Sequence, residues 1–140
     1  MKKPRSHAEQ SLHRAVAQIT LNLPIPPSLN ASYRNVAGVG RVKTDVLRRW
    51  IALAEWAAKA ELVKQSRAQP VFASDVSVDI LIERPNARRD LDNCAKAVLD
   101  LCTKLKVWDD DKRVIDLHLR WAPIDGCTVT VSEVPTREVK

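Results

Sequence analysis

Carboxylate side chains gather in one part of this sequence, and their spacing would suit the binding of a divalent metal ion. Asp90 and Asp92 follow two arginines, Lys96 comes four residues after Asp92, and three consecutive acids occupy positions 109–111. Seven of the seventeen acidic residues lie between positions 90 and 116. Neighbouring carboxylates repel each other unless a cation neutralises them. The pattern therefore predicts an acidic metal site.

Each part of this acidic pattern also has a purely structural interpretation. Asp90 or Asp92 could cap the N-terminus of a helix, where a carboxylate satisfies free N–H groups and the helix dipole. Asp92 and Lys96 could form an ordinary i,i+4 ion pair. Residues 109–111 could be an acidic turn. An EF-hand is excluded, because neither acidic group has the glycine and terminal glutamate that its loop requires.

The charge distribution adds a second indication of function. The 140 residues carry a net charge of +6, with twelve Lys/Arg against four Asp/Glu in residues 1–70 and eleven against thirteen in residues 71–140. A basic half beside an acidic cluster fits a surface that binds phosphates around a metal site. The alternative is that the basic half is only a solvated face with a charged tail.

The cysteines and the hydropathy pattern indicate the compartment. Cys94, Cys102 and Cys127 are an odd number without CxxC or CxxH spacing, so they predict neither a zinc site nor a disulfide scaffold. Gln18 and Asn22 interrupt the first apolar stretch, and no segment approaches transmembrane length. We expect a soluble, cytoplasmic protein with reduced thiols and no membrane partner.

Apolar periodicity predicts an α+β domain. Alternation indicates strands over residues 19–23, 76–82, 114–121 and 128–134, and helical spacing indicates helices over 45–65, capped by Thr44, and 92–105. Residues 28–43 are expected to be an exposed loop or irregular hairpin. The order β-α-β-α-β-β predicts a mixed sheet with two helices packed on one side. Residues 17–134 would form this domain, between a basic N-terminal tail (1–16), which could hold a short helix, and a C-terminal tail (135–140).

This outline separates the acidic residues. Asp90 and Asp92 enter the second helix, and a two-residue step in extended chain would put their side chains on one side. Residues 109–111 follow the far end of that helix, which at fourteen residues would be about 21 Å long. The two groups meet only if the chain turns back or if they come from different subunits.

Taken together, the motif resembles a known enzyme family. It reads Asp90-Leu91-Asp92-Asn93-Cys94-Ala95-Lys96, then Asp100, Val107-Trp108 and Asp110-Asp111, and Pro26-Pro27-Ser28-Leu29-Asn30 with Tyr33-Arg34 precedes it. This arrangement resembles the RusA family of Holliday junction resolvases, over roughly residues 17 to 134. The chain departs from the family pattern at Asp109, where an apolar residue is usual. This leaves Asp111 as the first choice for the last metal ligand and Asp110 as the second.

The resemblance implies a homodimeric, Mg²⁺-dependent endonuclease that nicks a four-way DNA junction symmetrically, in DNA recombination and repair. It implies that Asp90, Asp92 and Asp111 hold the metal and that Lys96 is a further catalytic residue. The basic residues are expected to contact DNA phosphates, with Asn30 as a further contributor: Arg34, Arg41, Lys43, Arg88 and Arg89. Two other hypotheses remain open: a non-catalytic, structure-selective DNA-binding protein, and a metal nuclease acting on flaps or other branched DNA.

Overall fold

The computed structural model describes residues 18–65 and 69–135. The predicted N-terminal tail and its short helix lie outside these residues, as does nearly all of the predicted C-terminal tail. Element order along the described chain agrees with the predicted α+β fold, apart from additions between the first strand and the first long helix.

One mixed sheet forms the centre of the fold, with strands in the order β1-β6-β4-β5. The strands are β1 (Gln18–Leu23), β4 (Val76–Ile82), β5 (Val114–Trp121) and β6 (Cys127–Glu133). β5 runs parallel to β4, whereas β6 runs antiparallel to both β4 and β1. Every second residue of β4 is fully buried, which is the alternation expected of a strand with one covered face.

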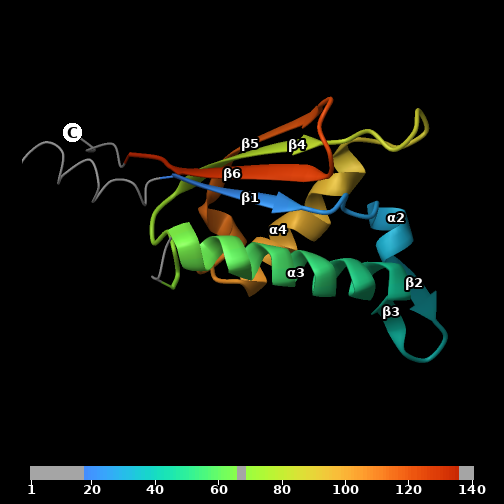
Figure 1. Cartoon of the computed structure of the whole chain (residues 1–140). Helices are drawn as coiled ribbons and strands as arrows, with labels where there is room; N and C mark the ends of the chain where they lie inside the picture. The colour runs from blue at the N-terminus through green and yellow to red at the C-terminus, as the bar shows by residue number, and fades with distance from the viewer. Residues whose placement is uncertain (1–17, 66–68, 136–140) are drawn as a thin grey trace, which may run out of the picture.

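Two helices, α3 (Asp45–Gln65) and α4 (Ala95–Lys104), lie on the same side of this sheet (Figure 1). Thr44 caps α3, because its hydroxyl oxygen accepts a hydrogen bond from the N–H of Leu47 at 3.3 Å. The buried stripe of α3 consists of Leu47, Trp50, Ala54, Ala58 and Leu62. The sequence prediction of a mixed sheet with both helices on one face is therefore confirmed.

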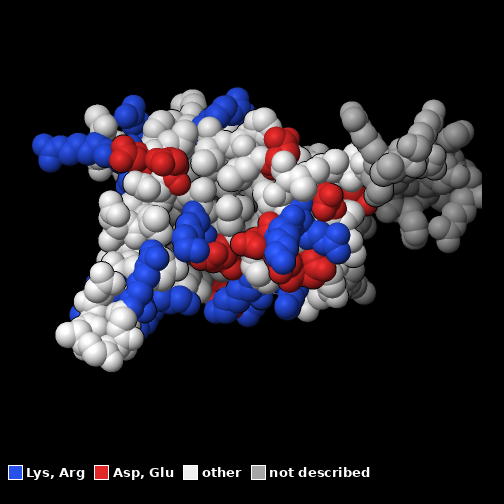
Figure 2. Space-filling view, turned by 180° about the vertical axis from the view of Figure 1, so that it is seen from behind, with Lys and Arg blue, Asp and Glu red and all other residues white. Residues whose placement is uncertain are grey.

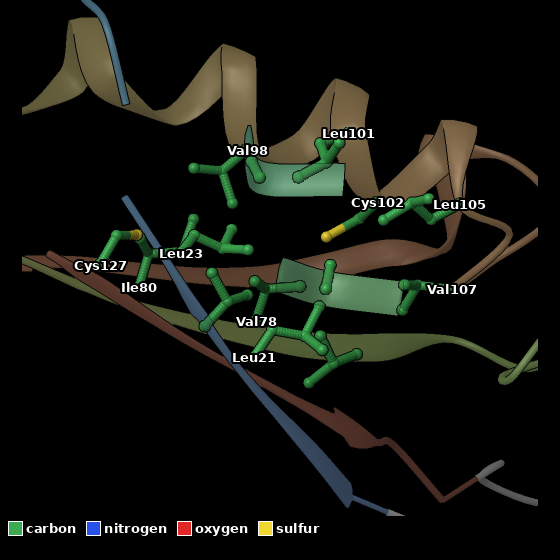
Figure 3. Packing of buried hydrophobic residues seen from close by; sticks show 14 of the residues in the cluster. Leu21, Leu23, Val78, Ile80, Val98, Leu101, Cys102, Leu105, Val107 and Cys127 are labelled. Atoms are coloured by element: carbon green, nitrogen blue, oxygen red, sulfur yellow. The ribbon is translucent and has the colours of Figure 1, made fainter. Parts of the chain in front are cut away.

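The core fills the space between α4 and the sheet (Figure 3). Val98, Leu101 and Cys102 point from α4 toward β4 residues such as Val78 and Ile80, and all five side chains are buried. Leu101 is one of the buried residues of α4, whereas Leu99 is only partly buried. Ala95, Val98, Cys102 and Leu105 are also buried.

The predicted irregular loop at residues 28–43 has more regular structure than expected. A short helix α2 (Leu29–Ser32) is capped by Ser28, whose hydroxyl accepts from the N–H of Ala31 at 3.2 Å. It leads into a hairpin of β2 (Tyr33–Val36) and β3 (Gly40–Lys43). Gly38 and Gly40 take positive φ at the turn, a backbone conformation that glycine adopts without steric cost. Among the described residues, no helix is long and apolar enough to cross a membrane.

Candidate active site

The first acidic group follows β4. The loop after Ile82 is held by Arg89, whose guanidinium donates a hydrogen bond to the carbonyl oxygen of Pro26 at 2.9 Å and lies 3.7 Å from the Cys94 sulfur. Arg88 is exposed, and its backbone N–H donates to the Asn86 side chain at 2.9 Å. Of the two arginines predicted to contact DNA, Arg89 therefore anchors the loop and Arg88 points into solvent.

Asp90 and Asp92 are both exposed at the start of the second helical segment. This segment begins with a 3-10 turn η2 (Asp92–Cys94), capped at Leu91, and α4 follows with Cys94 at its N-cap. Neither cap position carries a side-chain hydrogen bond, so the interpretation of Asp90 or Asp92 as a helix cap is wrong. Leu91 has helical φ and ψ, so the extended step assumed from the sequence is also wrong. Both carboxylates are left free for another purpose.

Lys96 lies in the first turn of α4, but it does not pair with Asp92. Its Nζ is 3.2 Å from the Oδ2 atom of Asp100, and both side chains are half-exposed. Lys96, Asp100 and Lys104 follow at i, i+4 and i+8, so they share one face of the helix. Lys104 was not predicted as a site residue, although this spacing could have indicated it; its Nζ lies 2.9 Å from Glu55.

The hairpin brings the predicted DNA-contacting residues together beside α4. A cavity of about 230 Å³ lies between α2, α3 and α4, and its lining includes Lys43 of the hairpin together with Lys96 and Asp100. A neighbouring groove of about 320 Å³ is lined by Leu29, Asn30, Tyr33, Arg34, Asn35 and Arg41. The Arg41 guanidinium stacks on the ring of Tyr33, 4.2 Å from its centroid. α2 contacts both η2 and α4, so this basic groove adjoins the end of α4 that carries Asp92.

The second acidic group lies beyond the other end of α4. Asp109 pairs with Arg113 at 3.0 Å, and this guanidinium lowers the pKa of the Asp109 carboxyl. Asp110 caps the 3-10 turn η3 (Asp111–Arg113) by accepting a hydrogen bond from the N–H of Lys112 at 2.9 Å, which lowers the pKa of Asp110. Asp111 is exposed and its side chain lies against the Asp110 carboxyl, but within the described part of the chain it pairs with no basic side chain. Asp109 and Asp110 are thus held by Arg113 and by the Lys112 N–H, whereas Asp111 is not.

A single chain does not bring the two acidic groups together. α4 alone, with ten residues, is about 15 Å long. Among the described residues, no three His, Cys, Asp or Glu side chains lie close enough to hold one metal ion. Figure 2, a view from behind, shows acidic side chains in several places among basic ones. Asp90 and Asp92 thus precede or begin the helical segment that contains α4, whereas Asp111 follows the other end of α4.

Comparison with known proteins identifies the family. Residues 24–135 match the family model described as "Endodeoxyribonuclease RusA". The chain is 33% identical over 106 residues to the crossover junction endodeoxyribonuclease RusA of Escherichia coli K12, covering 75% of this chain and 83% of that protein. It is also 33% identical over 105 residues to the same-named protein of Enterobacteria phage 82 (74% and 82% covered) and 31% identical over 106 residues to that of Shigella sonnei Ss046 (75% and 83% covered). The chain therefore belongs to the RusA family of endodeoxyribonucleases.

Proposed function

We propose that this protein is a Mg²⁺-dependent endonuclease that resolves four-way DNA junctions by paired, symmetric nicks. The observation that carries the proposal is the pair Asp90 and Asp92: two exposed carboxylates without a capping role, next to a basic groove, in a RusA-family chain. Such cuts are a step of DNA recombination and repair, and we place the activity in the cytoplasm.

The chemistry of the residues fits the proposed metal. Mg²⁺ prefers oxygen ligands and is commonly held by one or two carboxylates together with substrate phosphate and water. Asp90 and Asp92 supply two such carboxylates, and neither is used as a helix cap. When bound, the metal would lower the pKa of a water molecule and offset charge on the scissile phosphate. Asp111, the third proposed ligand, does not reach this position within the same subunit.

Lys96 and the hairpin would bind and orient the DNA. The Lys96 ammonium is held by Asp100 in the first turn of α4, where it can stabilise negative charge that develops on a phosphate or position the attacking water. Arg34 and Arg41 line the groove beside it, and Lys43 lines the adjoining cavity. Contacts of this type supply affinity and salt dependence but read no sequence.

Paired cuts across a two-fold symmetric junction require two active sites, which is the basis for proposing a homodimer.

A substrate panel decides between this function and its rivals. Labelled four-way, three-way, flap and linear DNA would be incubated with the protein, with and without Mg²⁺, and resolved on a denaturing gel. We expect symmetric nicks in the four-way junction alone, and only with metal. Efficient cleavage of flaps would assign a more general branched-DNA nuclease.

The variant Asp92→Asn supplies the matched control for this panel. We expect it to lose cleavage but keep its fold, and to bind the junction at least as tightly because carboxylate–phosphate repulsion is relieved. Binding would be measured by gel shift in a chelator, and folding by circular dichroism. If the wild-type protein binds the junction but leaves it intact under every condition, the protein is a DNA-binding module and the proposal fails.

A further inference from the structure

The cavity between α2, α3 and α4 combines apolar walls with charged side chains. Its buried apolar lining includes Leu47 of α3 and Ala97 and Leu101 of α4, with the partly buried Ile51 beside them. Four charged side chains that are exposed to solvent also line it: Lys43, Lys96, Asp100 and Lys104. The volume of about 230 Å³ lies just below the range of roughly 300–1,000 Å³ that is common for small-ligand sites. The cavity therefore suits a small ligand with an apolar body and polar edges.

The charges of the lining favour an anionic ligand. Three lysines against one aspartate give a net charge of +2. Lys96 pairs with Asp100 at 3.2 Å, and Lys104 pairs with Glu55 at 2.9 Å. No acidic side chain of the described residues pairs with Lys43, so its ammonium group is available to a ligand. An apolar flat body joined to a negative charge is the chemistry of a nucleotide. Asp100 and the lysines further offer an acceptor and donors to the hydrogen-bonding edge of a base.

The basic groove continues from this cavity. Leu29 and Tyr33 line both of them, and the Arg41 guanidinium lies over the Tyr33 ring. The rest of the groove is lined by polar or basic side chains: Asn30, Arg34, Asn35 and Arg41. A DNA strand whose phosphates follow this groove would pass the cavity, with one of its bases beside the opening.

We propose that the cavity accepts one base of the junction, unstacked from the strand that Lys96 and the groove hold. Extruding a base costs unstacking and unpairing energy, and this cost is smallest where pairing is already weakened. A branch point is such a place, because stacking is interrupted on one side of each pair that flanks it. Burial against Leu47 and Leu101 would offset the remaining cost, so the cavity would favour branched DNA over continuous duplex. The inference rests on the proposed function for its substrate, but it does not require cleavage.

Fluorescence of 2-aminopurine tests whether a base leaves the stack. This probe would replace each base beside the branch point in turn, and its emission rises when it unstacks. Wild-type protein would bind the junction in a chelator. We expect emission to rise on binding at one position, and to stay at the level of the free junction with Ala97→Phe, which fills the cavity. Ala97→Ser keeps the cavity open and is the matched control. No rise at any position, or an equal rise with Ala97→Phe, would overturn the proposal.

An abasic junction separates loss of the cavity from loss of the fold. The base that fluorescence identifies would be deleted, and gel shifts in a chelator would compare the two junctions. Ala97→Phe should weaken binding of the intact junction about tenfold and leave binding of the abasic junction unchanged, because only a base needs the space. Ile51→Phe fills the cavity from α3 and should behave alike; it replaces Ala97→Phe if circular dichroism shows that the latter unfolds. Equal weakening of both junctions by folded variants would show that no base enters.

A free nucleotide is the second possible source of the same ligand chemistry. Deoxyadenosine monophosphate would be titrated into the protein and followed by the thermal midpoint of unfolding. We expect at most a small rise at high nucleotide concentration, because the groove contacts of a continuous strand are missing. A large rise that Ala97→Phe removes, without any 2-aminopurine response, would assign the cavity to free nucleotides and overturn base capture. If the wild type binds the junction but never cleaves it, the proposed function fails, while the metal-free fluorescence and gel shifts still decide the role of the cavity.

Discussion

At the residue scale, the three consecutive carboxylates differ in what their side chains already do. Asp109 pairs with Arg113 and Asp110 caps η3, which leaves Asp111 available. We expect Asp111→Asn to abolish junction cleavage without lowering the thermal midpoint of unfolding. Asp110→Asn should lower the midpoint slightly, because a weaker acceptor faces the Lys112 N–H, and should keep cleavage. If Asp110→Asn lost cleavage and Asp111→Asn kept it, Asp110 rather than Asp111 would be the metal ligand.

The cysteine thiols offer a second prediction at this scale. Burial raises the pKa of Cys102 to about 12, with a further contribution from Cys127, and burial likewise raises the pKa of Cys127 to about 12. Only the thiolate reacts, so at pH 8 a raised pKa together with burial should suppress reaction in the folded protein. We expect a colorimetric thiol reagent to label Cys102 and Cys127 slowly in native protein and rapidly in denaturant. Fast native labelling at Cys102, located by mass spectrometry, would show that α4 opens readily.

At the element scale, apolar periodicity predicted the helices and strands whose formation depends on the local sequence. α3 was predictable because Thr44 supplies a cap and its apolar residues recur at helical spacing. The four sheet strands were predictable for the same kind of reason. α2 was not, because four residues capped by Ser28 carry too little periodicity to distinguish a helical turn from a loop.

The candidate site was predictable only in part. The motif and its family resemblance proposed Asp90, Asp92, Lys96 and Asp111 as site residues, yet residue spacing could not place their side chains in space. Leu91 is helical, whereas an extended backbone was expected between Asp90 and Asp92. Lys96 forms its ion pair with Asp100 rather than with Asp92. Both outcomes depend on how η2 joins α4, which is decided by tertiary packing rather than by residue spacing.

The loop after β4 supports a prediction that separates two adjacent arginines. Arg88 is exposed, whereas Arg89 donates to the Pro26 carbonyl. We expect Arg88→Ala to leave stability unchanged, weaken junction binding and reduce its salt dependence by about one phosphate contact. Arg89→Ala should cost about 1–2 kcal/mol of unfolding free energy, since it leaves a part-buried acceptor without its charged donor. Urea unfolding and salt titration of binding measure the two effects, and identical behaviour of both variants would refute this division of roles.

At the scale of the whole molecule, the fold keeps the two acidic groups apart. Asp90 and Asp92 lie before α4, and the second acidic group lies beyond its other end. A junction with two-fold symmetry offers two equivalent phosphates, and a two-fold dimer offers two equivalent sites.

The proposed homodimer has a thermodynamic consequence for the wild-type protein. Unfolding a dimer releases two chains, so mass action makes the folded state more stable as protein concentration rises. We expect the thermal midpoint of the wild type to increase over a hundredfold range of concentration. Differential scanning fluorimetry measures this shift, and because no DNA or metal is needed, a flat wild-type curve would count against the proposed homodimer whatever the outcome of the cleavage assays.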